Sequence, residues 1–145
     1  IFMKKGFTLI ELLVVIAIIA LLSTLSVVAL NSARAKSRDA RRVSDIKQLR
    51  TALEMYFDQN QSYPTTTGAL GSGNFACLNS AGWAAVNCSG TVYMQKVPTD
   101  PKNSTPFVYT YTPQGSGATS YTIAYALEGP STTATATPDT IGYNQ

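Results

Sequence analysis

Apolar residues follow two different patterns along the first part of the chain. From Phe7 to Leu30 the sequence is almost entirely apolar, a run long enough to cross a ~30 Å hydrocarbon core as a helix. Beyond it, apolar residues recur at intervals of three and four, as on one face of a helix: Ala40, Val43, Ile46, Leu49, Leu53 and Tyr56 or Phe57. No Pro or Gly occurs between Phe7 and Asp58, so the pattern predicts one continuous helix of about 52 residues, ~78 Å long.

Near the carboxyl end, the helical period gives way to the two-residue period of a strand. In residues 106–112 and 120–127 large apolar side chains occupy every second position, and the turn-forming residues 113–117 lie between the two runs. This pattern predicts an antiparallel hairpin. The inner face of such a sheet is the natural cover for the amphipathic half of the helix. The predicted fold class is therefore α+β: a long N-terminal helix, apolar in its first half and amphipathic in its second, packed by a small antiparallel sheet.

The same patterns divide the chain into segments. We expect a leader at residues 1–6 with the natural start at Met3, an apolar segment at 7–30, and a head at 31–145. Within the head, the amphipathic half of the helix covers 31–58, a loop 59–105, and the sheet and tail 106–145. The loop is predicted to hold little regular structure apart from a short strand or helical turn at 92–97. The Thr-rich stretch 131–138 is consistent with an edge strand, a surface tail or an O-glycosylated segment.

Composition excludes most catalytic chemistry. The chain of 145 residues has no histidine and two cysteines, and its acidic residues are scattered without a paired spacing. An enzyme is therefore not predicted. Cys77 and Cys88 are predicted to form a disulfide, because an apolar segment of this length indicates that the head is exported from the reducing cytoplasm.

The formal net charge is +3, and basic residues gather directly after the apolar run: Arg34, Lys36, Arg38, Arg41, Arg42, Lys47 and Arg50. Cations at this position meet anionic headgroups or acidic partner chains, or form a solvated helix face. DNA binding is a further interpretation. It is not favoured, because no aromatic residue that could stack on bases occurs between these cations. Charge alone would also orient the segment opposite to the direction that Lys4 and Lys5 favour, so a dedicated export signal is needed.

Glu11 is the one charged residue of the apolar run. A charge at the centre of a bilayer costs on the order of 3 kcal/mol, and an anchor with no other task would avoid that cost. Glu11 is therefore predicted to have a functional role.

The opening residues Lys4-Lys5-Gly6-Phe7-Thr8-Leu9-Ile10-Glu11 resemble the class III signal of type IV pilins and pseudopilins. The resemblance implies that a prepilin peptidase cuts between Gly6 and Phe7 and methylates the new amino terminus. It also implies that in a filament the Glu11 carboxylate neutralises the Phe7 amine of a neighbouring subunit and so sets the axial register. A burial of charge of this kind is acceptable only when the charge is paired.

A second resemblance lies further along, where Tyr93 to Pro101 followed by Pro106 to Tyr109 is similar to the segment that leads into the sheet in major pseudopilins. Together these resemblances predict the major pilin of a bacterial type IV pilus, a homopolymer that serves adhesion or motility. The alternative is a pseudopilin of a type II secretion or competence (DNA-uptake) system. Either protein would start as a precursor in the cytoplasmic membrane and be polymerised by an assembly machinery, the pilin into a filament at the cell surface.

The resemblance also raises calcium as a cofactor, since acidic residues ligate calcium in some major pseudopilins. Asp100 lies in the turn before the hairpin and is the candidate ligand. One carboxylate cannot supply the six to eight oxygens that calcium takes, and an Asp that caps a turn is the favoured alternative. No other cofactor is predicted.

Overall fold

The computed structural model describes residues 6–85, 88–129, 133–138 and 141–143. Met3 and the leader residues before Gly6 therefore lie outside the described part of the chain. The chain divides into two compact units, Ile1–Ala35 and Lys36–Gln145. The predicted boundary after Leu30 falls inside the first unit.

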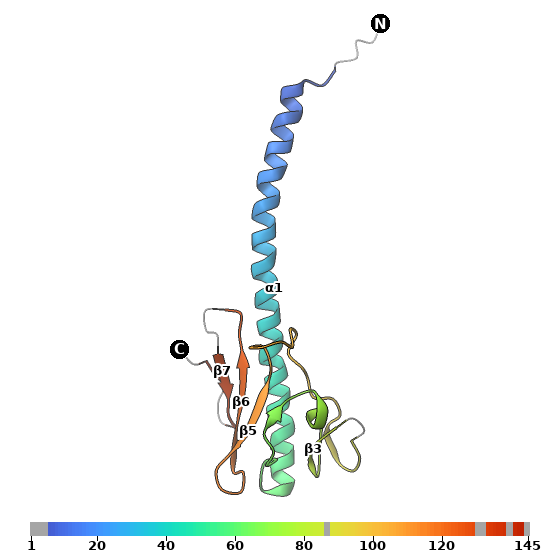
Figure 1. The fold of residues 1–145 in the computed structure, drawn as a ribbon, viewed down its shortest axis with the longest axis vertical. Coiled ribbons are helices and arrows are strands. Elements are labelled where there is room, and N and C mark those ends of the chain that lie inside the picture. The colour runs from blue at the N-terminus through green and yellow to red at the C-terminus, as the bar shows by residue number, and fades with distance from the viewer. Residues whose placement is uncertain (1–5, 86–87, 130–132, 139–140, 144–145) are drawn as a thin grey trace. The chain divides into compact units, whose positions relative to one another are not determined.

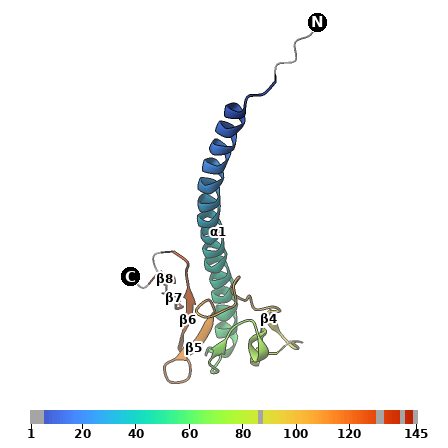
Figure 2. The same ribbon diagram turned by 45° about the horizontal axis from the view of Figure 1, so that its top comes forward.

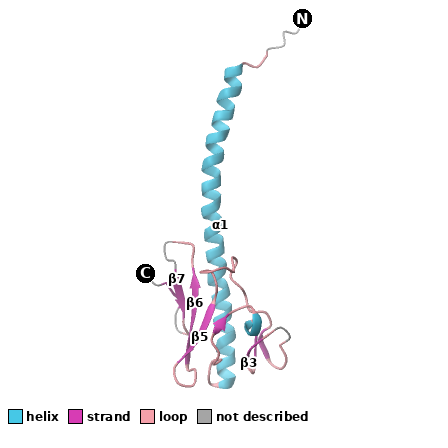
Figure 3. Cartoon of the chain, viewed as in Figure 1, coloured by secondary structure: helices cyan, strands magenta, loops and turns pink. Residues whose placement is uncertain are grey.

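The described elements are one long helix, one short 3₁₀ turn and a set of short strands (Figures 1 and 3). In chain order they are α1 (Leu9–Asn60), β1 (Gly68–Ala69), η1 (Gly73–Phe75), β2 (Cys77–Asn79), β3 (Gly82–Ala84), β4 (Val92–Met94), β5 (Thr110–Gln114), β6 (Ser120–Ala126), β7 (Thr133–Ala136) and β8 (Ile141–Tyr143). A long N-terminal helix with antiparallel sheets confirms the predicted α+β class.

The helix α1 is continuous over 52 residues, as the absence of Pro and Gly predicts. It ends at Asn60, because Gln61 adopts a left-handed backbone with φ of 54° and Pro64 follows. The Gln61 amide donates to the carbonyl of Phe57 at 2.7 Å and so satisfies one of the last free carbonyls.

In the second unit, the buried face of α1 packs on the core. Ile46, Leu49 and Leu53 have no exposed surface, which confirms the central part of the predicted stripe. The prediction that the stripe starts at Ala40 was wrong. Ala40 is exposed, and Arg42 is fully buried at the start of the buried face. Arg42 lies four residues before Ile46, on the same helix face, where it donates hydrogen bonds to carboxylates of the head.

The larger sheet has the strand order β1-β5-β6-β7-β8, and all its strand pairs are antiparallel. Figure 1 shows β5, β6 and β7 beside the second half of α1 and β3 toward the opposite side of that half. In Figure 2, β4 lies on the side of α1 opposite to β5, β6 and β7. The β5–β6 hairpin pairs Tyr111 with Ile123. Tyr121, Ile123 and Tyr125 are at most 2% exposed, so their predicted alternation is confirmed.

The predicted bounds of the first hairpin strand were wrong by several residues. Residues 106–109 are not part of it, because the chain turns tightly where the Phe107 amide donates to the carbonyl of Ser104 at 2.6 Å. Pro113 was predicted in the turn but belongs to β5, opposite Tyr121. A proline is tolerated there because β1 pairs only with Thr110 and Tyr111, so among the described residues that edge of β5 is open at Pro113.

Part of the Thr-rich tail forms strand β7 at residues 133–136, but this is not an edge strand, because β7 pairs with β6 on one side and with β8 on the other. Ala134 and Ala136 have no exposed surface, since their small side chains belong to the hydrophobic core. Residues 131 and 132 lie outside the described residues, and glycosylation of this stretch stays a prediction.

The predicted loop 59–105 holds more regular structure than its sequence indicates. Its middle forms a second sheet with the order β3-β2-β4, and β4 realises the strand alternative predicted at 92–97. A disulfide joins Cys77 to Cys88, as predicted, with 6.2 Å between their Cα atoms. The very short strands explain why periodicity did not reveal them, because two or three residues contain no repeat.

Candidate assembly segment and charged cluster of the head

Two features among the described residues are candidates for function, one in each unit. In the first unit, α1 begins at a reciprocal cap between Thr8 and Glu11. The Glu11 Oε2 atom accepts hydrogen bonds from the Thr8 amide at 2.8 Å and from the Thr8 hydroxyl at 2.6 Å. The Glu11 amide donates in return to the Thr8 hydroxyl at 3.3 Å. This capping box fixes where the helix starts and holds the carboxylate beside the first turn.

Phe7 and Glu11 lie on the same side of this helical start. They border one open hollow together with Ile10, Val14 and Val15. The Gly6–Phe7 bond lies before the helix, and both residues are exposed. The structure thus places the residues of the predicted processing and assembly site close together.

The large apolar side chains from Phe7 to Leu30 are 46% to 82% exposed. By length and composition, α1 is long and apolar enough to cross a membrane. Bare apolar surface of this extent is unfavourable in water, so this segment requires lipid or other chains around it.

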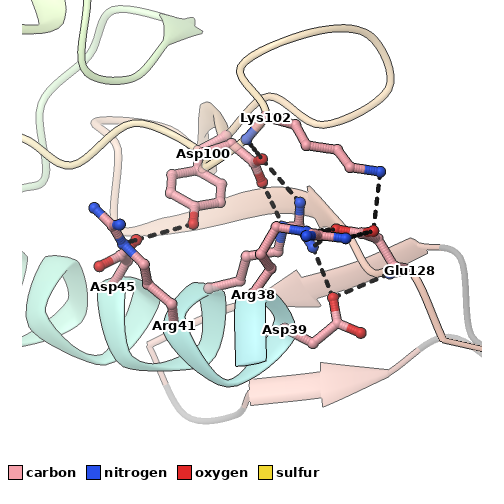
Figure 4. A network of polar contacts seen from close by, with 9 residues as sticks. Arg38, Asp39, Arg41, Asp45, Asp100, Lys102 and Glu128 are labelled. Carbon is pink, nitrogen blue, oxygen red and sulfur yellow. Dashed lines mark hydrogen bonds and ion pairs between the residues drawn. The ribbon is translucent and has the colours of Figure 1, made fainter. Parts of the chain in front are cut away.

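In the second unit, the buried guanidinium of Arg42 is the centre of a charged cluster. Figure 4 labels the other members of this cluster, which are Arg38, Asp39, Asp100, Lys102 and Glu128. The Nε and Nη2 atoms of Arg42 donate to the two carboxylate oxygens of Asp100 at 2.6 and 2.9 Å. Its Nη1 atom donates to Asp39 at 2.7 Å and to Glu128 at 2.9 Å. These acids come from the helix, from the turn before β5 and from the end of β6, so Arg42 joins three segments distant in sequence.

Two further cations complete the cluster at Glu128. Arg38 donates to both carboxylate oxygens at 2.6 Å each, and the ammonium of Lys102 lies 2.9 Å from Oε2. The Lys102 ammonium and the Arg42 guanidinium also lie 4.5 and 4.7 Å from the centre of the Phe107 ring. Three carboxylates and three cations therefore balance one another, as charges taken out of water must.

The cluster shifts the pKa of its members. Hydrogen bonds from Arg38, Lys102 and Arg42 hold the pKa of Glu128 well below its usual range, although desolvation opposes them. Burial also disfavours the charge of Asp100, but hydrogen bonds from Arg42 and the Lys102 amide outweigh it and lower the pKa. The bond to Asp100 raises the pKa of Arg42 further, so this side chain is a permanent cation.

Asp45 lies one helical turn further along and behaves differently. It accepts a hydrogen bond from the Tyr109 hydroxyl at 3.1 Å, and its nearest cation is the exposed Arg41 at 4.0 Å. Desolvation raises the pKa of Asp45, because this hydrogen bond and the distant Arg41 charge compensate only part of the burial.

The structure separates the predicted basic stretch into two groups. Arg38 and Arg42 belong to the charged cluster, and Arg50 donates to the carbonyl of Pro138 in the tail. Arg34, Lys36, Arg41 and Lys47 are exposed. Several of the cations that a DNA-binding interpretation would need are thus engaged inside the head.

Asp100 does not have the environment of a calcium ligand. Both of its carboxylate oxygens accept from Arg42, and Oδ1 also accepts from the Lys102 amide at 2.8 Å. Among the described residues no group of three or more acidic, His or Cys side chains is arranged to hold a metal ion. The bond to the amide two residues ahead is the turn-capping geometry that the sequence analysis favoured.

Sequence reasoning missed Thr8, Arg42 and Glu128. Thr8 and Glu11 have the spacing of a capping box, which the sequence displays. Arg42 falls on the apolar stripe at the spacing of Ile46, a signal that it is buried. Glu128 had no such signal, because its role depends on contacts 86 and 90 residues away in sequence.

Comparison with known proteins gives two family matches. Residues 1–27 match the prokaryotic N-terminal methylation motif, and residues 28–134 match the family described as type II secretion system (T2SS), protein G. Curated relatives named type II secretion system core protein G include one from Escherichia coli (strain K12), 38% identical over 68% of this chain and 66% of that protein. The relative from Klebsiella pneumoniae is 37% identical over 70% of this chain and 71% of its own length.

A third relative of the same name, from Aeromonas hydrophila, is 43% identical over 46% of this chain and 47% of its own length. The match thus spans between about half and two thirds of several relatives. No solved structure matches the chain. These findings favour the pseudopilin alternative over the surface pilus as the description of this protein.

Proposed function

The chain belongs to the type II secretion system protein G family, and on this premise we propose that it is a pseudopilin that polymerises into the short filament of a type II secretion system. The precursor is anchored in the membrane by its apolar helix. The role of the mature subunit is structural, and its chemistry is that of assembly.

The single observation that carries this proposal is the exposed apolar surface from Phe7 to Leu30. In a bilayer, lipid covers this surface. A subunit that leaves the bilayer must exchange lipid for an equally apolar neighbour, and the same segment of a second copy provides one. A homopolymer with the apolar helices in its interior follows from this requirement.

Processing is the first step that can be tested. We expect a prepilin peptidase to cut after Gly6 and leave a methylated Phe7, which intact mass and N-terminal sequencing of material from the native cell would identify. A Cβ atom added at Gly6 meets no atom within 4 Å, so Gly6→Val leaves the fold intact. Loss of processing in that variant then reflects recognition by the peptidase. A native filament whose subunits retain Gly6 would refute this step.

Assembly depends in this proposal on the Glu11 carboxylate and the Phe7 amine of a neighbour. Two variants separate the charge from the helix cap. Glu11→Gln keeps a side chain that can accept from Thr8, whereas Glu11→Ala loses both charge and cap. We expect both variants to fold their heads and to lose filament formation. Normal filaments from Glu11→Gln would refute the role of the charge.

Secretion distinguishes this function from a surface pilus or a DNA-uptake fibre. Deletion of its gene in the native cell should impair export of folded proteins into the medium, and renewed expression of the chain should restore that export. Unchanged export together with lost surface fibres would favour the pilus, and unchanged export with lost transformation would favour DNA uptake.

A further inference from the structure

The head contains a cation at the place where the family resemblance suggested calcium. Arg42 is fully buried, and its guanidinium donates to carboxylates of Asp39, Asp100 and Glu128. A metal ion that cross-links a fold does the same task, since it collects oxygen ligands from segments far apart in the chain. We propose that Arg42 is the structural cation of this head, and that the head is therefore stable without calcium.

The occupancy of the carboxylates supports this proposal. Calcium takes six to eight oxygens at about 2.3 to 2.6 Å. Both oxygens of Asp100 and both oxygens of Glu128 already accept from cations of the chain at 2.6 to 2.9 Å. Each would have to exchange a bidentate, charge-assisted pair for the ion, and the displaced guanidinium would be left buried without a partner.

The charge balance of the cluster also argues against a bound calcium ion. The carboxylates of Asp39, Asp100 and Glu128 are matched by Arg38, Arg42 and Lys102. A divalent ion added to a neutral buried cluster introduces an uncompensated charge of two, whose desolvation is costly.

A covalently attached cation also has a consequence for function. A head held by calcium gains stability in proportion to the logarithm of the free calcium concentration. The Arg42 guanidinium is always charged and always present, so the stability of this head does not follow the calcium supply outside the cytoplasm. This inference goes beyond the proposed secretion role, and an isolated chain is enough to test it.

The test is thermal unfolding of the full chain in detergent micelles, followed by near-ultraviolet circular dichroism. Samples contain either a few millimolar CaCl₂, the same concentration of MgCl₂, or EGTA. We expect the melting temperature of the unsubstituted chain to agree among the three within about 1 °C, because no ligand binds the folded state. A rise of several degrees in calcium over magnesium would overturn the proposal.

A substitution tests the structural role of Arg42 directly. Arg42→Met removes the guanidinium and leaves Asp100 without its counter-charge, so we expect a melting temperature several degrees lower in all three solutions. The matched control is Arg41→Met, since Arg41 is the adjacent residue and its side chain is 67% exposed. We expect the control to melt like the unsubstituted chain. An Arg42→Met head that melts like the Arg41→Met control would also overturn the proposal. If this variant does not fold, the unsubstituted chain still decides the question.

Discussion

Removal of Arg42 should be one of the most damaging single changes in the head, and the damage should concentrate at Asp100. Without the guanidinium, Glu128 keeps Arg38 and Lys102 as partners. Asp39 keeps a hydrogen bond from the Glu128 amide at 3.0 Å. The Asp100 carboxylate has no exposed surface and would keep only backbone donors. Arg42→Met thus leaves essentially one buried carboxylate without a counter-charge.

The expected loss of unfolding free energy follows from the partners that each carboxylate keeps. Breaking a buried pair by removal of one partner costs about 3 to 5 kcal/mol of unfolding free energy. Asp100→Asn alone removes a charge-assisted interaction while the amide oxygen can still accept from Lys102, and should cost about 1.5 to 3 kcal/mol. The double variant has no unpaired buried charge, because the carboxylate and the guanidinium are both removed. Its loss of unfolding free energy should therefore be smaller than the sum of the two single losses by about 1 to 3 kcal/mol.

The assay is urea unfolding of the full chain in detergent micelles, with near-ultraviolet circular dichroism of the tyrosines and Trp83 as the signal and linear extrapolation to water. Arg41→Met is the control and should change stability by less than about 0.5 kcal/mol. Additivity of Arg42→Met and Asp100→Asn within 0.5 kcal/mol would refute the reasoning, because it would mean that the pair is not coupled in solution. A loss for Arg41→Met equal to that for Arg42→Met would refute it as well.

Three further outcomes are expected. Replacement of both Cys77 and Cys88 by Ala should cost about 3 kcal/mol in urea unfolding, the entropy of closing a loop of this length, and a loss below about 0.5 kcal/mol would contradict this. Because the pKa of Glu128 is low in the folded head, its stabilising contribution is complete above the pKa of an unfolded Glu, near 4.3, and is lost as the pH falls below that value. Glu128→Gln should therefore flatten the acid side of a plot of unfolding free energy against pH. Burial raises the pKa of Tyr111, so its contribution is complete below about pH 10 and is lost as the pH rises further. Phenolate absorbance before the head unfolds that is present in this chain and absent from a Tyr111→Phe variant would contradict the burial of Tyr111.

The local parts of the structure were predictable from particular residues. The helix follows from an uninterrupted stretch without Pro or Gly, and the β6 face follows from the alternation of Tyr121, Ile123 and Tyr125. The disulfide follows from two cysteines and an export context. In each case the determining signal lies within a few neighbouring positions or in the composition of the chain.

The second sheet and the strand bounds of the hairpin were not predictable in this way. β2, β3 and β4 have three residues each, too few to show a period. Pro113 has the local character of a turn residue, and only its place at an open edge of the sheet permits it in a strand.

By itself the sequence determined that this chain carries an N-terminal methylation motif and an apolar helical segment with one carboxylate, because the order of Gly6, Phe7 and Glu11 at the start of an apolar run is a local pattern. It did not determine what the basic stretch does. Arg41 and Arg42 are identical residues at adjacent positions, and the sequence treats both as cations on a helix. Helical spacing places Arg42 on the apolar stripe, and only the tertiary structure decides that carboxylates from three segments surround it there while Arg41 faces solvent. The physical reason is that a buried charge is stable only beside its counter-charges, and these come from residues 58 and 86 positions away.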